Sequence, residues 1–165
     1  MGQERSIFKK GGTIPVDDDF MEVTFDKFTF RVMKDYLYHP EECWAKEEGG
    51  LIKVGVTDFL QKVAGDVAFL ELPEAGKELS RDGGAGNMET IKTSIMLISP
   101  VGGLIKEVNG GLDENPQLVN TDPYGEGWLF KVEPGAWEGD KKLLMDAQAY
   151  FPRMKDKIKE EMSPK

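Results

Sequence analysis

Cysteine and histidine are almost absent from the chain, which has 165 residues but only one of each, Cys43 and His39. A single cysteine excludes an intrachain disulfide and a thiolate metal cluster. A single histidine excludes a multi-histidine metal site. His39 is the one histidine that could act as the base for a Cys43 nucleophile, and we expect Cys43 instead to be a half-buried apolar residue.

The chain also lacks long apolar runs and an excess of basic residues. No run approaches the roughly 20 apolar residues of a membrane span, and the first residues lack the apolar core of a signal peptide. We therefore expect a cytoplasmic protein without a membrane association. The 30 acidic residues outnumber the 21 basic ones, giving a formal net charge of −9. That charge repels a phosphate backbone, so nucleic acid is not expected as a partner.

The usual sequence signatures of enzymes are missing as well. A P-loop needs a glycine directly before its Lys-Ser/Thr pair, but Ile91 precedes Lys92, and no Gly-x-Gly-x-x-Gly follows a predicted strand. The acidic run at 17–19 lacks the alternating ligands and terminal glutamate of a calcium loop. Adjacent glutamates at 41–42 and 47–48 show no spacing typical of a glycosidase pair. This scarcity predicts a non-catalytic carrier or binding module.

Short strands separated by glycine and proline dominate the middle of the chain. Alternating apolar and polar residues predict a strand from Phe20 to Val32. This density of strands indicates a mainly β fold, either a sandwich or a barrel. The sequence Gly-Gly-Leu-Ile-Lys at 49–53 recurs at 102–106, which would suit a sandwich with internal pseudo-symmetry. Further short strands are predicted at 51–56, 67–72, 88–93, 96–99, 103–108 and 128–132.

Two helices are predicted. Thr57 or Asp58 can cap a short helix that ends at Gly65. After Pro134, apolar residues from Leu143 and Leu144 to Met154, spaced by three and four, predict an amphipathic C-terminal helix, interrupted near Pro152. We expect its apolar face to pack on the sandwich; binding a partner is the alternative role for that face. The resulting organisation is a flexible N-terminal arm at 1–20, a β-sandwich domain at 21–134 and a C-terminal helical extension at 135–165.

Lys92 lies between two of the predicted strands, downstream of a glycine-rich stretch. Gly83, Gly84 and Gly86 are expected to let the intervening hairpin turn tightly. A short hairpin presents the side chain at its tip outward, where a modifying enzyme can reach the ammonium group. Amide formation there would remove the positive charge and add a flexible arm. The alternative is that Lys92 is an ordinary exposed turn lysine.

The motifs around Lys92 resemble, in their order and spacing, those of the H protein of the glycine cleavage system, the carrier whose lysine bears lipoic acid. The resemblance extends from about Trp44 to Pro134. It implies that Lys92 is the lipoyl-lysine and that Glu89 is the acidic residue three positions before it. The matching segments are Val54–Phe59, Gly65–Gly76, Glu89–Lys92, Pro100–Gly103, Val108–Asn109 and Asn115–Leu129.

The resemblance implies a fold, a cofactor and partners. The fold would be a lipoyl/biotinyl-type β-sandwich, or barrel-sandwich hybrid, with a short helix after Thr57 and a C-terminal helix. Lipoic acid would be bound covalently to Lys92 by a lipoate ligase or transferase. The protein would be a monomeric carrier, not an enzyme, that moves the aminomethyl group of glycine between glycine decarboxylase, aminomethyltransferase and lipoamide dehydrogenase.

Two departures from the H-protein pattern leave a second function open. Glu42-Cys43 stands where a His-Glu pair commonly precedes the tryptophan that aligns with Trp44. Apolar Ile95-Met96 follows Thr93-Ser94, where the family usually has polar residues. The alternative is an H-like lipoate-binding protein that carries sulfur for a heterodisulfide-reductase-like complex in sulfur oxidation. An unlipoylated scaffold is a third possibility.

Overall fold

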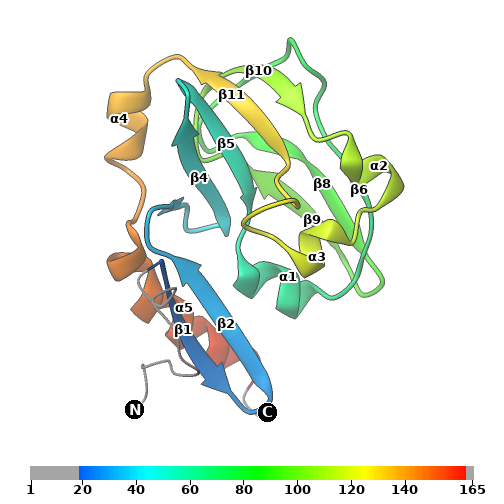
Figure 1. Ribbon diagram of the computed structural model, residues 1–165, viewed down its shortest axis with the longest axis vertical. Helices are drawn as coiled ribbons and strands as arrows, with labels where there is room; N and C mark the ends of the chain where they lie inside the picture. Colours follow the sequence, from blue (N-terminus) through cyan, green and yellow to red (C-terminus); the bar gives the residue numbers. More distant parts are fainter. Residues whose placement is uncertain (1–18, 163–165) are drawn as a thin grey trace.

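The computed structural model describes residues 19–162, and these residues form three antiparallel sheets with five helices (Figure 1). A six-stranded sheet has the order β3-β4-β5-β11-β10-β7, and a three-stranded sheet has the order β6-β8-β9. A two-stranded hairpin, β1-β2, stands apart from both. None of the described helices is long and apolar enough to cross a membrane. The strands are β1 Phe20–Phe25, β2 Phe28–Met33, β3 Leu37–Tyr38, β4 Cys43–Glu48, β5 Leu51–Val56, β6 Val67–Glu71, β7 Glu78–Leu79, β8 Gly84–Thr90, β9 Ser94–Ile98, β10 Gly103–Val108 and β11 Phe130–Pro134; the helices are α1 Asp58–Ala64, α2 Gly111–Glu114, α3 Leu118–Thr121, α4 Trp137–Lys141 and α5 Ala147–Met162.

The two larger sheets enclose one apolar core, which confirms the predicted mainly β sandwich. A strand directs alternate side chains to opposite faces of its sheet, so one face of a strand can supply this core. In β5, for example, Ile52 and Val54 are buried whereas Lys53 between them reaches the surface. The core includes Ile52, Val54, Ile105, Phe130 and Val132 from the six-stranded sheet and Val67, Ala85, Met88 and Leu97 from the three-stranded sheet.

The repeated pentapeptide begins two equivalent strands. β5 and β10 both pair with β11, one on each side of it. Ile52 and Ile105, which occupy the same place in the two copies, both lie opposite Val132. The repeat therefore marks a local pseudo-symmetry about β11, as the sequence suggested.

The N-terminal part of the chain differs from the single strand predicted for 20–32. Residues 20–33 form a hairpin with a two-residue turn at Asp26 and Lys27. Asp26 has a positive φ of 59°, a conformation that aspartate tolerates in tight turns. The alternation of apolar residues continues on both sides of the turn, so the period alone did not show it. The predicted arm at 1–20 lies outside the described residues except for Asp19 and Phe20.

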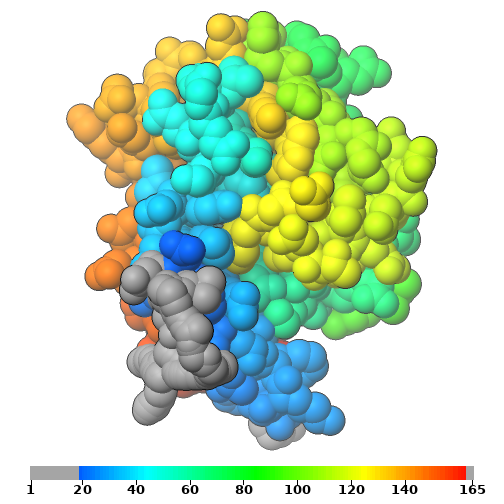
Figure 2. Space-filling view, in the orientation of Figure 1, coloured from blue at the N-terminus to red at the C-terminus, as the bar shows by residue number. Residues whose placement is uncertain are grey.

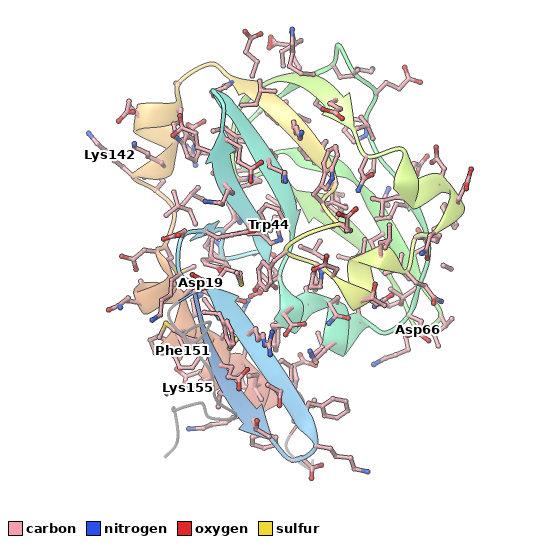
Figure 3. All side chains as sticks on the ribbon, in the orientation of Figure 1. Asp19, Trp44, Asp66, Lys142, Phe151 and Lys155 are labelled. Carbon is pink, nitrogen blue, oxygen red and sulfur yellow. The ribbon has the colours of Figure 1, made fainter. Side chains whose placement is uncertain are left out.

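The hairpin packs with α5 around a second apolar cluster (Figures 1 and 3). The C-terminal helix was predicted to be interrupted near Pro152, but α5 continues through it. The missing Pro152 N–H removes one helical hydrogen bond, and the buried side chains on both sides hold the helix in place. Leu143 and Leu144, predicted within the helix, precede it. The buried cluster contains Phe30, Val32, Tyr38, Trp44, Phe59, Ala147, Tyr150, Phe151, Met154 and Ile158. The division at 134–135 into a sandwich and an extension stays a prediction.

A buried carboxylate joins α5 to α1. Glu42 accepts hydrogen bonds from Thr57 Oγ1 (2.7 Å), from the Tyr150 hydroxyl and from Lys157 Nζ (2.6 Å). Thr57 also caps α1 as predicted, because its Oγ1 accepts from Leu60 N at 3.1 Å. A buried charge with these donors is compensated. The network therefore fixes the start of the helix whose other end lies beside Lys92.

Candidate functional site

Lys92 is exposed in the turn between β8 and β9, where the sequence predicted it. β8 runs from Gly84 to Thr90, so the strand predicted at 88–93 begins and ends earlier than expected, and Ile91–Thr93 form the turn. Thr90 closes this turn. Its backbone N donates to Thr93 O (2.8 Å), and its Oγ1 accepts from the backbone N of Lys92 (3.1 Å) and of Thr93 (3.0 Å). The lysine backbone is therefore held firmly while its side chain projects from the sheet.

The turn rests on the end of α1. Ile91 N donates to Asp66 O at 3.1 Å, and Lys92 Nζ donates to Val63 O at 2.9 Å. Asp66 lies at the margin of the molecule (Figure 3). The Val63 carbonyl belongs to the last turn of α1, where carbonyls lack helical partners and attract cations. The ammonium group of Lys92 thus satisfies a free helix end, and this contact is lost when the side chain moves out.

Gly65 gives the lysine stem its space. It ends α1 with φ 93° and ψ −172°, a region that is essentially restricted to glycine. A Cβ atom at this position would lie 3.2 Å from Lys92 Cδ. The predicted helix stop is therefore confirmed, and it has a second role that the sequence did not reveal, because it lets the lysine lie against the helix end.

We expect Gly65→Ala to lower the free energy of unfolding by about 1–3 kcal/mol, the usual cost of a strained backbone conformation. It should also displace the Lys92 side chain from Val63 O. Urea denaturation measures the first effect. Gly135→Ala is the matched control, because a Cβ there meets nothing within 4 Å. Equal stability of the two variants would contradict the assigned strain.

Glu89 lies in β8 directly opposite Ser94 in β9. Ser94 Oγ donates to Glu89 Oε2 at 2.6 Å. The pair sits beside the turn on the outer face of the three-stranded sheet. Glu89 is therefore a half-buried acceptor, oriented by Ser94, in the strand that leads into the Lys92 turn.

Cys43 and His39 do not form a catalytic pair. His39 Nδ1 accepts from Glu41 N (2.9 Å), so Nε2 carries the proton and donates to Asp82 Oδ1 (2.6 Å). That hydrogen bond lowers the pKa of the Asp82 carboxyl. Cys43 is fully buried in the sandwich core rather than half-buried. Burial raises its thiol pKa to about 12.

The raised pKa predicts an unreactive thiol. The thiolate is the reactive form of cysteine. Because the Cys43 side chain stays protonated and inaccessible at mildly alkaline pH, it should not react. We expect no reaction of the native protein with a colorimetric disulfide reagent, and one thiol per chain after denaturation. Rapid modification of the native protein would show that the core opens around β4.

A cleft of about 760 Å³, lined by both charged and aromatic side chains, lies between the hairpin, α1 and the segment 120–125. The blue hairpin and the yellow segment meet in Figure 2. Two of the three cationic side chains that line this cleft are paired with carboxylates: Lys62 Nζ contacts both Asp58 carboxylate oxygens (2.9 and 3.0 Å), and Arg31 Nε contacts Glu22 Oε1 (3.1 Å). The cleft shares α1 with the Lys92 site, and its Lys62 and Arg31 are already engaged by carboxylates.

The sequence profile of the glycine cleavage H-protein family matches residues 36–157. This range includes both larger sheets and the Lys92 turn. The chain belongs to the glycine cleavage H-protein family. The hairpin β1-β2 precedes this range, so it lies outside the part of the chain that matches the family.

Individual H proteins give the same result. The chain is 42% identical over 119 residues to the glycine cleavage system H protein of Thermus thermophilus, covering 72% of this chain and 92% of that protein. It is 43% identical over 113 residues to that of Bacteroides thetaiotaomicron, covering 68% and 89%. The solved H protein of Mycobacterium marinum superposes with a TM-score of 0.68 at 34% identity, covering 74% of this chain and 98% of that one.

Proposed function

We propose that the protein is the lipoyl carrier of a glycine cleavage system and that lipoate is attached to Lys92. The observation that carries the proposal is an exposed lysine at a rigid turn in a chain of the H-protein family. The surroundings of Lys92 fit such a group, because its side chain makes one hydrogen bond, to Val63 O, and lies in the open. When bound, the dithiolane would supply reversible disulfide and group-carrying chemistry.

The chain itself positions the arm. Hydrogen bonds to Thr90 and Asp66 fix the backbone of the turn, so the attachment point keeps its position relative to the sheet. The tether holds the cofactor at roughly millimolar effective concentration near each partner. No side chain of this protein is required to make or break bonds, which agrees with a carrier subunit that serves glycine decarboxylase, aminomethyltransferase and lipoamide dehydrogenase. We also propose a cytoplasmic monomer.

The relatives favour glycine cleavage over the sulfur-carrying alternative. The matching family and the curated relatives named above bear glycine cleavage names. The departures at Glu42-Cys43 do not place a new reactive group beside Lys92. Cys43 is buried in the core, and Glu42 is occupied by Thr57, Tyr150 and Lys157.

Two measurements test the proposal. Co-expression with a lipoate ligase should give one lipoyl addition by intact mass, located at Lys92 by peptide mapping. The modified protein should then stimulate exchange of the glycine carboxyl group with bicarbonate by glycine decarboxylase. An unmodified protein would overturn the carrier function. A modified protein that gives no stimulation would overturn its assignment to glycine cleavage and leave sulfur carriage as the better account.

A further inference from the structure

Exposed large apolar side chains cluster around Lys92. Phe69, Met96 and Ile91 have 56%, 63% and 76% of their surface exposed. Among the described residues only two other large apolar side chains are comparably exposed, Phe28 and Leu143. Single exposed apolar residues are ordinary, but a cluster marks a binding surface. Three of five such residues belong to one small sheet and its turn.

Strand register places Phe69 and Met96 of this cluster on the outer face of the three-stranded sheet. Phe69 lies opposite Glu89, and Met96 lies opposite Asn87. Directly opposed residues share a face, and faces alternate along a strand. The chain neighbours of these outward residues, Leu70, Met88 and Ile95, pack on the core. Phe69 and Met96 therefore share the outward face with Glu89, on the two edge strands roughly 10 Å apart.

The reach of an unmodified lysine identifies the partner. Lys92 Nζ lies at most about 6 Å from its Cα, because its stem has only four carbons, and it is bonded back to Val63 O. An enzyme that acylates this amine must bring its active site directly onto the turn and cover the side chains beside it. Once the arm is attached, its reactive end reaches partners much farther from the sheet.

We infer that Phe69, Met96 and Ile91 form the docking surface for the enzyme that acylates Lys92. The inference rests on the proposed function, because it assumes that Lys92 is the attachment site. In the reaction the deprotonated amine attacks the carbonyl carbon of a lipoyl adenylate. The N–C bond forms, the bond from the carbonyl carbon to the phosphate oxygen breaks and AMP leaves. The proton lost by the amine passes to solvent or to a base of the acylating enzyme.

The test compares outward apolar residues near and far from Lys92. Acylation rates are measured with a purified lipoate ligase, lipoate and ATP for the wild type, Phe69→Ser, Met96→Ser and the double variant. Phe28→Ser and Leu143→Ser are matched controls, because they also remove exposed apolar side chains. We expect kcat/KM to fall about tenfold or more in the double variant, as for a central binding contact, and to stay unchanged in the controls.

Two further readouts separate docking from distortion. Acetylation of Lys92 by a small water-soluble reagent, followed by peptide mass spectrometry, should be equally fast in all variants. Fully lipoylated variants, prepared with excess ligase, should stimulate glycine–bicarbonate exchange as the wild type does. Unchanged enzymatic acylation of the double variant would overturn the inference. So would a loss that appears only in the exchange reaction, or a finding that the patch instead mediates self-association. Failure of the wild type to be acylated would instead refute the proposed function.

Discussion

The Lys92→Arg variant is expected to fold as the wild type does and to lose carrier activity completely. Arginine keeps the positive charge and can still donate to Val63 O, which Lys92 Nζ contacts at 2.9 Å. Its guanidinium group stays protonated at all working pH values, so it cannot attack an acyl donor. Without the tethered arm, glycine–bicarbonate exchange should fall to the level measured without this protein. Intact mass should show no lipoyl addition.

Lys106→Arg provides the matched control. Lys106 is an exposed lysine on β10, with a distant ion pair to Glu133 at 4.0 Å. We expect full lipoylation, full exchange activity and an unfolding free energy within about 0.5 kcal/mol of the wild type, as is usual for surface substitutions. A lipoyl addition that survives Lys92→Arg would place the attachment at another lysine, and the proposed site would be wrong.

The parts of the fold that local chemistry determines could be read from the sequence. Thr57 and Gly65 bound α1 because a hydroxyl cap and a glycine stop act within a few residues of the helix ends. The repeated strands β5 and β10 were visible because the same apolar pattern serves the same position beside β11. The exposed place of Lys92 follows from the two strands that flank it.

The parts that depend on distant contacts could not be predicted in this way. Nothing near Val63 in the sequence shows that its carbonyl accepts from Lys92, 29 residues later. The exposure of Phe69 and Met96 is equally hidden, because an apolar residue in a strand is usually assigned to the core. Two other features depend on the second apolar cluster, which joins the hairpin β1-β2 to α5. They are the hairpin turn at Asp26 and the continuity of α5 through Pro152.

The glycines before Lys92 have a different role from the one predicted, and this leads to a prediction of a large effect. Gly86 lies within β8 at a register shift, well before the turn. Its φ is 104°, and an added Cβ would overlap the backbone carbonyl of Glu71 in β6. We expect Gly86→Ala to lower the free energy of unfolding by about 3 kcal/mol, because the backbone strain and the overpacking both destabilise the folded protein. Thermal unfolding should shift down by roughly 6–12 °C.

Gly84→Ala is the control, since it makes the same chemical change two residues earlier in the same strand. A Cβ at Gly84 meets Met96 Sδ at 3.3 Å, and this flexible side chain can move aside. We therefore expect Gly84→Ala to lower the free energy of unfolding by less than about 1 kcal/mol. The difference between the two variants measures how closely β8 must approach β6. Because β8 carries Glu89 and leads into the Lys92 turn, Gly86→Ala should also slow lipoylation near its melting temperature. Equal melting temperatures for the two variants would mean that the close approach at Gly86 does not fix this sheet.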